Sequence, residues 1–336
     1  MKIAILAPVA WRTPPRHYGP WEQVASNIAE GLIAQGMDVT LFATSDSLTA
    51  GKLDAVIPKG YEEDREQDAK VAESLHISNL VEKAAGFDII HNNFDFLPLT
   101  YSRLIKTAMV TTIHGFSSQK IIPVYQKYND TSSYVSISNA DRSPLLRYAA
   151  TVYNGIKVAD FDFNDKPADY LLYFGRIHHD KGTAEAIEIA LKSKRKLVIA
   201  GIIQDGSYFD KKIKPFLNEQ VSYIGEAGPE KRNDLLGNAA ALLHPINFDE
   251  PFGLSVAEAM LCGTPVIAFN RGSMPELIRH ERTGFMVKTI NEAVYAVNNI
   301  SQINRRDCHQ WSLEQFSQNR MVTEYIKLYD AVLGKI

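Results

Sequence analysis

Short apolar runs alternate with longer segments of helical periodicity along the whole chain. Runs this short and this apolar are typical of parallel strands that are buried on both faces. The intervening segments, such as Trp21–Gln35, Thr183–Lys192 and Pro229–Asn238, show the pattern of amphipathic helices. The runs predict strands over Ile3–Ala7, Val39–Ala43, Asp88–His91, Met109–His114, Ser133–Ile137, Thr151–Tyr153, Tyr170–Phe174, Lys196–Ala200, Val221–Ile224, Ala241–His244, Pro265–Phe269 and Gly284–Val287.

This alternation of strands and helices runs twice, with a polar boundary between the two halves. Asn154-Gly155 is a turn signal, and the stretch that follows is polar and ends in proline, as linkers often do. We therefore predict two doubly wound α/β lobes, 1–155 and 168–315, joined by a linker over 156–167. Ligands of open α/β sheets sit outside the carboxyl ends of the strands, so we expect the site in the cleft between the lobes.

Composition narrows the class of protein. The 336 residues are 45% hydrophobic and 22% charged, which is typical of a globular chain with two cores. Lys and Arg total 36 against 39 Asp and Glu, a balance that argues against a dedicated nucleic-acid binder. No apolar run approaches the ~20 residues that cross a bilayer, so no integral membrane segment is expected. Two cysteines are too few for a disulfide framework, which favours a cytoplasmic location.

The most informative segment is 249–260, which follows the predicted strand ending at His244. A helix is expected to begin near Phe252 or Gly253. The backbone amides from Phe252 to Leu254 would then form a helix N-terminus, which suits the anionic oxygens of a ligand. The segment is therefore a candidate binding site.

Two glutamates flank this helix start. The i, i+4 spacing places Glu258 in line with Leu254, on a stripe that otherwise looks buried. A buried carboxylate needs hydrogen-bond donors, and the hydroxyls of a ribose would supply them. The alternative is that Glu258 only complements the helix dipole. Glu250 lies in the loop ahead of the helix, where it could accept hydrogen bonds from a sugar.

The pair Glu250 and Glu258, with Pro-Phe-Gly directly after the first, resembles the two-glutamate signature of glycosyltransferase family 4. Gly263–Ala268 and Gly272–Leu277 look like the next strand and loop of that family, and the resemblance covers nearly the whole chain. It implies a GT-B fold, in which two Rossmann-like lobes face each other across a cleft, and a retaining transfer from a nucleotide-sugar donor to a hydroxyl acceptor. It also implies that Glu258 holds the ribose hydroxyls of the donor and Glu250 those of the transferred sugar.

Two cations lie in the loop after the predicted strand Tyr170–Phe174. Arg176 and Lys181 stand between two glycines that allow close approach of the backbone to a ligand. Cations at such a place stabilise the negative charge that develops on the β-phosphate of a departing nucleoside diphosphate. The resemblance to family 4 implies that both bind the donor diphosphate. The alternative is a surface loop with solvated cations.

The first lobe carries less specific signals. Gly19 opens a helix where family 4 places two glycines against the diphosphate, but the second is Pro20 here, which removes one amide donor. The resemblance implies that His114, at the end of a predicted strand, contacts the donor sugar near the reacting centre. Ser138 and Asn154 lie in segments that look like the cleft lining of the family. The alternatives are a helix cap without ligand at Gly19 and a structural role for His114.

Two short patterns suggest a metal, but neither is expected to hold one. Asp160–Asp162 matches the Asp-x-Asp pattern by which other transferases bind Mg²⁺, although patterns of three residues arise often by chance. His178–Asp180 offers metal ligands, yet adjacent side chains diverge and Lys181 would repel a cation. We therefore expect a metal-independent enzyme without a cofactor.

The substrates are less well defined by the sequence. UDP-glucose is the default donor, and Pro14–Gly19 resembles the corresponding run of pterin glucosyltransferases, which favours a small soluble acceptor. The alternatives are a nucleotide-sugar epimerase or a phosphorylase on the same fold, and a nucleotide-sugar sensor without catalysis. The oligomeric state and any association with a membrane surface stay open.

The C-terminal segment Ser312–Leu333 has one long helical pattern. In GT-B relatives the terminal helix crosses back to the first lobe. The resemblance therefore implies that a helix over about 316–336 packs on the N-terminal lobe of this chain.

Overall fold

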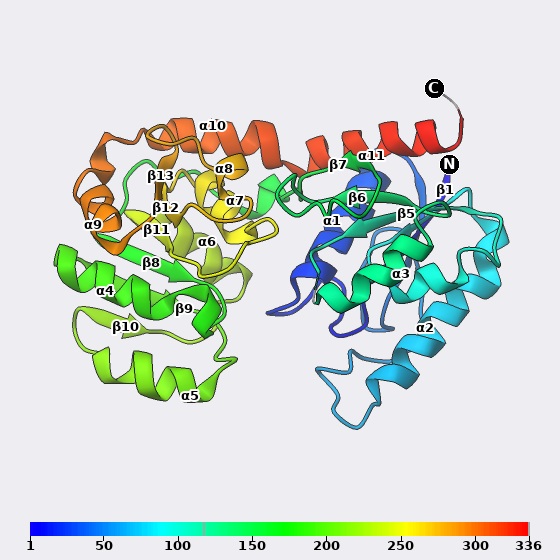
Figure 1. The fold of residues 1–336 in the computed structure, drawn as a ribbon, viewed down its shortest axis with the longest axis horizontal. Coiled ribbons are helices and arrows are strands. Elements are labelled where there is room, and N and C mark those ends of the chain that lie inside the picture. The colour runs from blue at the N-terminus through cyan, green and yellow to red at the C-terminus, as the bar shows by residue number, and fades with distance from the viewer. Residues whose placement is uncertain (117, 335–336) are drawn as a thin grey trace. The chain divides into compact units, whose positions relative to one another are not determined.

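The computed structural model describes residues 1–116 and 118–334, and it forms two compact units. Unit 1 comprises Met1–Gly155 together with the C-terminal segment that begins at Gln318, and unit 2 comprises Ile156–Ser317. Each unit is built on one sheet of parallel strands with helices packed against it (Figure 1). This architecture confirms the predicted fold class of two Rossmann-like, doubly wound lobes.

The sheet of unit 1 has the strand order β3-β2-β1-β4-β5-β6-β7 in the described part of the chain, with every neighbouring pair parallel. The chain order reverses between β1 and β4, so the topological switch point of this sheet lies where these two strands end. The strands are β1 (Lys2–Leu6), β2 (Asp38–Phe42), β3 (Lys52–Asp54), β4 (Ile89–Asn92), β5 (Ala108–Ile113), β6 (Ser133–Ser136) and β7 (Tyr148–Thr151).

Two edge strands of unit 1 differ from the sequence prediction. β3 was not predicted, because its sequence Lys-Leu-Asp contains no apolar run and its residues are exposed or half-buried. β7 ends at Thr151, whereas the apolar run predicted a strand over Thr151–Tyr153. Both strands have a sheet partner on one side only, so their sequences need less apolar surface than those of central strands.

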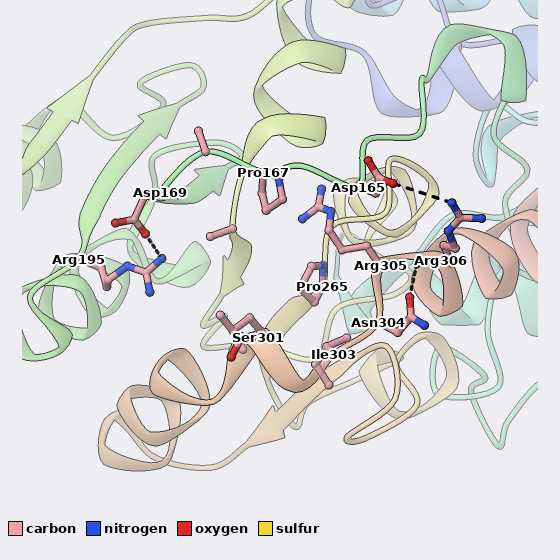
Figure 2. A pocket seen from close by; sticks show the side chains of 13 residues that line it. Asp165, Pro167, Asp169, Arg195, Pro265, Ser301, Ile303, Asn304, Arg305 and Arg306 are labelled. Atoms are coloured by element: carbon pink, nitrogen blue, oxygen red, sulfur yellow. Dashed lines mark hydrogen bonds and ion pairs between the residues drawn. The ribbon is translucent and has the colours of Figure 1, made fainter.

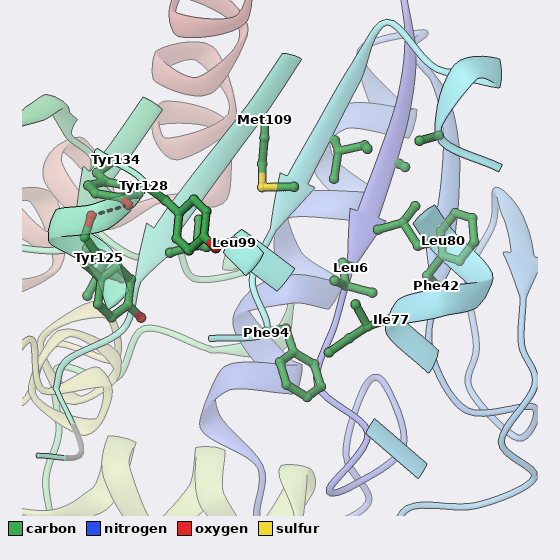
Figure 3. Packing of buried hydrophobic residues seen from close by; sticks show 14 of the residues in the cluster. Leu6, Phe42, Ile77, Leu80, Phe94, Leu99, Met109, Tyr125, Tyr128 and Tyr134 are labelled. Carbon is green, nitrogen blue, oxygen red and sulfur yellow. Dashed lines mark hydrogen bonds between the residues drawn. The ribbon is translucent and has the colours of Figure 1, made fainter. Parts of the chain in front are cut away.

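The main helices of unit 1 are α1 (Pro20–Ala34), α2 (Ala69–Lys83), α3 (Ile122–Lys127) and α11 (Gln318–Val332). The side chain of Asp68 caps α2 by accepting a hydrogen bond from the amide of Val71 at 3.1 Å. A buried cluster packs around β1, β4 and β5, and its members include Leu6, Phe94 and Tyr134 (Figure 3). Burial of such side chains, at ~1.5–3 kcal/mol each, is the main force that holds the unit together.

Helix α11 is anchored in unit 1 by buried polar contacts as well as by its packing against α1 (Figure 1). The hydroxyl of Tyr329 lies 2.6 Å from Nδ1 of His91, and Nε2 of His91 lies 2.7 Å from Oγ1 of Thr112. Oγ1 of Thr112 in turn lies 2.7 Å from the hydroxyl of Tyr325. All four residues are buried, so these contacts attach the C-terminal helix to two central strands of the sheet.

The single helix predicted over Ser312–Leu333 is wrong. The structure divides this segment between α10, which ends at Phe316, and α11, which begins at Gln318. Ser317 between them has extended backbone angles and forms a parallel bridge with Ile156. The apolar residues Phe316 and Met321 on the two sides of the break are five positions apart, so the helical spacing of three or four residues is interrupted there.

Unit 2 has the strand order β10-β9-β8-β11-β12-β13, and its switch point lies between β8 and β11. Helices α4 and α9 pack together on this sheet, and α7 contacts both α6 and α10. The strands are β8 (Tyr170–Phe174), β9 (Lys196–Ala200), β10 (Val221–Tyr223), β11 (Ala241–His244), β12 (Val266–Phe269) and β13 (Gly284–Val287). The helices are α4 (Thr183–Ser193), α5 (Gly206–Tyr208), α6 (Pro229–Asn238), α7 (Leu254–Leu261), α8 (Met274–Leu277), α9 (Ile290–Asn298) and α10 (Arg305–Phe316).

The segment 156–167, which the sequence suggested as a linker, packs within unit 2. Phe161 is buried, and the guanidinium of Arg232 lies over its ring at 5.1 Å. The backbone amide of Asp162 donates to the side-chain oxygen of Asn233 at 2.9 Å. The polar composition of this segment concealed these contacts with α6.

None of the helices in the described part of the chain combines the length and the apolarity that a membrane-spanning segment requires.

Candidate functional site

The loops that carry the predicted cations and the first predicted glutamate meet at the switch point of unit 2. The cation loop (residues 175–182) follows β8, and the glutamate loop (residues 245–253) follows β11, which is the neighbour of β8 in the sheet. Both loops therefore leave the carboxyl edge of the sheet at the place where open α/β folds bind ligands.

A glycine lets the two loops touch. Gly182 has a φ of 73°, in the left-handed region, and a Cβ at this position would lie 1.8 Å from the carbonyl oxygen of Pro245. No other residue type fits without displacing the glutamate loop. The cation loop is also fixed at its other end, where the hydroxyl of Tyr173 donates to the carbonyl oxygen of Arg176 at 2.7 Å.

Lys181 and Glu250 form the central pair of this site. Nζ of Lys181 donates to Oε2 of Glu250 at 2.6 Å, and the two side chains are 15% and 12% exposed. The ammonium group also lies 4.6 Å from the centre of the Phe248 ring. Arg176, the second predicted cation, hydrogen-bonds Oε1 of Gln204 in the loop after β9. The structure therefore brings Lys181 and Glu250 into contact, and it places Arg176 in the same loop as Lys181.

His244, the last residue of β11, lies behind this pair. Its Nε2 is 3.7 Å from Oε2 of Glu250, and burial lowers the pKa of its imidazole to about 4. The negative charge of Glu250 raises this pKa and the positive charge of Lys181 lowers it, but burial has the larger effect. His244 is therefore neutral at pH 7, and Lys181 is the cation that faces Glu250.

A second segment holds the glutamate loop in place. The amide of Ser273 donates to the carbonyl oxygen of Glu250 at 2.9 Å, and its hydroxyl donates to the carbonyl oxygen of Phe252 at 2.7 Å. A Cβ on Gly272 would lie 2.4 Å from the backbone nitrogen and oxygen of Glu250. Helix α7 begins at Leu254 with Gly253 as its N-cap, one residue after the predicted start. The N-terminal amides of α7 thus follow directly on the glutamate loop.

Glu258 is buried on α7 and forms an ion pair that the sequence did not predict. Nη1 of Arg232, on α6, lies 3.3 Å from Oε1 of Glu258, and the two side chains are 20% and 9% exposed. Burial raises the pKa of the Glu258 carboxyl above its usual value, and the nearby charge of Arg232 offsets part of that rise. Arg232 was missed because one arginine in the polar pattern of a surface helix gives no signal of its own.

In unit 1, His114 follows β5 and lies among aromatic and amide groups. Its ring stacks on Trp21 of α1 with 5.6 Å between the ring centres, and its Nε2 lies 3.2 Å from Oδ1 of Asn93. Burial lowers the pKa of His114 to about 3. Asn93 follows β4 directly and is fully buried, which the sequence analysis did not anticipate. The sequence feature that could have identified Asn93 is its position, because it is a polar residue at the carboxyl end of an apolar run.

Gly19 is the N-cap of α1 and has a φ of 152°. A Cβ at this position would lie 2.8 Å from Cβ of Pro15 and 3.0 Å from Oε2 of Glu22. Glu22 is buried in the first turn of α1 and accepts a hydrogen bond from the amide of Trp11 at 3.2 Å. Burial raises the pKa of Glu22 to about 7. Glu22 is not among the site residues predicted from the sequence.

The remaining predicted residues of unit 1 are Ser138 and Asn154, and both are buried. Oγ of Ser138 accepts a hydrogen bond from the amide of Asp141 at 3.1 Å, after the end of β6. Asn154 precedes the last residue of the N-terminal part of unit 1. Their part in substrate binding stays a prediction.

The structure shows the contacts of the two sequence patterns that suggested a metal. Asp162 accepts a hydrogen bond from the side-chain amide of Asn233 at 2.9 Å, so the Asp-x-Asp pattern takes part in packing of unit 2. The rings of His178 and His179 do not diverge as expected, because their centres are 4.1 Å apart. Together with Asp205 they offer three ligand atoms within 4.8 Å of one another. Independence from a metal therefore stays a prediction.

A cavity of about 510 Å³ lies at the opposite edge of the unit 2 sheet (Figure 2). Asp169, Arg195 and Pro265 in its wall directly precede β8, β9 and β12, so the cavity faces the amino ends of the strands. Arg195 is paired with Asp169, and Arg305 donates to three backbone carbonyl oxygens. This cavity is therefore separate from the candidate site at the carboxyl edge.

Comparison with known proteins agrees with this fold. The family model described as glycosyl transferases group 1 matches residues 159–312, and the model described as glycosyltransferase family 4 matches residues 21–160. An uncharacterized glycosyltransferase of Methanocaldococcus jannaschii is 22% identical in an alignment of 335 positions. The alignment covers 85% of this chain and 85% of that protein. The chain therefore belongs to the family 4 glycosyltransferases of GT-B type.

Two solved structures are similar over the whole chain. AviGT4, a glycosyltransferase involved in avilamycin A biosynthesis, aligns with a TM-score of 0.75 and 22% identity over 100% of this chain and 99% of its own. Anabaena HepE in complex with UDP-glucose aligns with a TM-score of 0.73 and 17% identity over 98% of this chain and 100% of its own. At these identities the likeness shows a shared fold.

Proposed function

We propose that this chain is a retaining, metal-independent glycosyltransferase that moves glucose from UDP-glucose to a hydroxyl of a small acceptor. The observation that carries the proposal is the contact between Lys181 and Glu250, a cation and a carboxylate from the two loops at the switch point of unit 2. Such a pair offers one group to a diphosphate and one to the hydroxyls of a sugar. The structural likeness to HepE, which was solved with UDP-glucose, supports the choice of donor.

The proposed donor site lies at the carboxyl edge of the unit 2 sheet. Glu258 accepts hydrogen bonds from the ribose hydroxyls, and Arg232 favours the ionised form of its carboxyl group. Arg176 and Lys181 bind the diphosphate, each with a charge-assisted bond of ~1.5–3 kcal/mol. The amides from Phe252 to Leu254 at the start of α7 also suit phosphate oxygens. Glu250 accepts hydrogen bonds from the transferred sugar.

In the transfer step, the bond between the anomeric carbon and the oxygen of the β-phosphate breaks, and its electron pair stays on that oxygen. The acceptor oxygen forms its bond on the same face of the carbon, which retains the configuration. The proton of the acceptor hydroxyl passes to the departing diphosphate. The protein contributes position and charge stabilisation, because Arg176 and Lys181 meet charge that grows in the transition state.

Unit 1 supplies the remaining substrate contacts in this proposal. His114 is neutral, so it takes part as a hydrogen-bonding group and not as a cation. Gly19, Ser138 and Asn154 lie near the ends of strands or the start of α1 and complete the proposed contact set. The resemblance of Pro14–Gly19 to pterin glucosyltransferases makes pterins with a free hydroxyl the first acceptors to test.

The test is a transfer assay with purified protein, UDP-glucose and a panel of small hydroxyl compounds that includes pterins. We expect a glucosylated product whose anomeric proton coupling in NMR reports the α configuration of the donor, with unchanged yield in EDTA. A product of inverted configuration, or a loss of yield that added Mg²⁺ restores, would contradict the mechanism. Turnover of UDP-glucose to another nucleotide-sugar without acceptor would indicate an epimerase, and binding without turnover a sensor.

A further inference from the structure

Two buried polar atoms next to each other in unit 1 have no hydrogen-bond partner among the residues that the structure describes. They are Nδ1 of His114 and Nδ2 of Asn93, and the two side chains are linked through their other polar atoms at 3.2 Å. His114 is 8% exposed and Asn93 is fully buried. Leaving a buried polar atom without a partner destabilises the fold, so two of them at the carboxyl edge of a sheet point to a ligand that supplies the partners.

The contact between the two side chains determines where His114 carries its proton. Oδ1 of Asn93 is a carbonyl oxygen and can only accept a hydrogen bond, so Nε2 of His114 must be the donor. In a neutral imidazole only one nitrogen is protonated, and Nδ1 is then left with its lone pair. Burial lowers the pKa of His114 to about 3, so the ring is neutral at pH 7.

Neighbouring groups hold the His114 ring in its orientation. The ring of Trp21, from α1, stacks on His114 with an angle of 27° between the planes, which restricts rotation of the imidazole. His91 of β4 is also buried, and burial lowers its pKa to about 3, with a smaller lowering from a positive charge on His114. The first turn of α1 also carries Glu22, whose buried carboxyl has a pKa raised to about 7. The shift of the His114 pKa comes from burial of its ring.

We propose that Asn93 is a positioning residue for sugar transfer: it fixes His114 as the tautomer protonated on Nε2, so that Nδ1 accepts a hydrogen bond from a substrate hydroxyl. This inference rests on the proposed function for the identity of the substrate, but the assignment of the tautomer does not. The chemistry recognised is an alcohol hydroxyl that acts as a donor. It belongs to the transferred sugar or to the acceptor.

The first test is ¹⁵N NMR of histidine-labelled protein between pH 6 and 8. Comparison with the His114→Gln variant identifies the His114 signals, and His76, another buried histidine of unit 1, serves as an internal reference. We expect Nε2 of His114 to be protonated and Nδ1 to have the shift of an unprotonated ring nitrogen. In Asn93→Leu we expect the two nitrogens to give averaged shifts while those of His76 stay in place. A wild-type protein with protonated Nδ1 would overturn the inference.

Titration then locates the hydroxyl. A shift of Nδ1 on addition of UDP-glucose, but not of UDP, assigns it to the transferred sugar. A shift that needs the acceptor as well assigns it to the acceptor. No shift with either substrate would overturn the role of Nδ1. These readouts need no catalysis, so a wrong tautomer and a missing transferase activity are distinguished from each other.

The second test is the pH dependence of transfer in Asn93→Asp. A carboxylate beside Nε2 favours the imidazolium, in which Nδ1 is also a donor and can no longer accept. We expect the variant to lose kcat as the pH falls, approaching tenfold per pH unit below the new pKa of His114, while the wild type shows no such decline between pH 6 and 8. A folded Asn93→Asp variant with a wild-type pH profile would overturn the proposal.

Discussion

Nζ of Lys181 lies 2.6 Å from Oε2 of Glu250, although the two residues are 69 positions apart in the sequence. The pair occupies the switch point of the unit 2 sheet, and Phe248 covers the ammonium group. Each group thereby neutralises the charge of the other. A donor that brings both a diphosphate and sugar hydroxyls gives each of them a further partner, which makes this pair the most direct place to test the proposed function.

Replacement of Lys181 by alanine is expected to lower kcat/KM for transfer by about 10- to 100-fold, because one charge-assisted bond to the leaving diphosphate is lost. The measurement is steady-state kinetics with UDP-glucose, together with a thermal denaturation midpoint to confirm folding. Lys212→Ala removes an exposed lysine of the same unit and should leave kcat/KM unchanged. A folded Lys181→Ala enzyme with wild-type kcat/KM would contradict the proposed diphosphate site.

The two glutamates should differ in what they recognise. Glu258→Gln is expected to raise the Kd of UDP and of UDP-glucose alike by roughly tenfold, since both ligands carry the ribose. Glu250→Gln should raise the Kd of UDP-glucose by a similar factor and leave that of UDP unchanged or lower, because Lys181 loses its competing partner. Isothermal titration calorimetry of both ligands measures all four values.

Glu188→Gln is the matched control for these variants, because Glu188 is an exposed glutamate on α4 whose ion pair is with Lys192. It should bind both ligands as the wild type does. If Glu250→Gln weakened UDP as much as UDP-glucose, the assignment of Glu250 to the sugar would be wrong.

The buried carboxyl of Glu22 makes stability depend on pH. Its pKa is raised to about 7 in the folded protein from an ordinary value of 4.5, so the folded state binds more protons than the unfolded state between these values. The free energy of unfolding should therefore fall by about 3 kcal/mol as the pH rises from 4.5 to 7 on account of this group. Urea denaturation at several pH values should reveal this decline.

Glu22→Gln cannot ionise, so it should lack that part of the pH dependence. Its amide oxygen can still accept the hydrogen bond from the amide of Trp11. Glu30→Gln, on the same helix but only half-buried, should retain the dependence. Identical pH profiles for the wild type and Glu22→Gln would show that the carboxyl does not titrate in this range.

The buried contacts of α11 predict how strongly the C-terminal helix is attached. Tyr329→Phe removes the hydroxyl that lies 2.6 Å from Nδ1 of His91 and leaves that buried nitrogen without this partner. We expect a loss of about 1–3 kcal/mol in the free energy of unfolding, measured by chemical denaturation. Tyr295→Phe alters a tyrosine that is 68% exposed and should have no measurable effect. Equal stabilities of the two variants would refute the anchoring role.

The pattern of apolar and polar residues along the chain determined many of the strands. The runs Tyr170–Phe174, Lys196–Ala200 and Ala241–His244 became strands with the predicted bounds, because a strand buried on both faces needs a short unbroken apolar run. The prediction was wrong where a pairing partner decided the outcome. Ser317 ends α10 because its backbone pairs with Ile156, and no periodicity along the chain records that contact.

In the candidate site, too, the sequence determined some features and the tertiary structure decided others. The sequence by itself placed Arg176, Lys181 and Glu250 in loops that follow strands and Glu258 on the next helix. Their resemblance to the family 4 motifs then made them candidates for binding a nucleotide-sugar. Only the tertiary structure decided their partners, such as Arg232 beside Glu258. The physical reason is range: apolar period and turn chemistry act over a few residues, whereas an ion pair or a tautomer depends on atoms that the folded backbone brings together from distant positions.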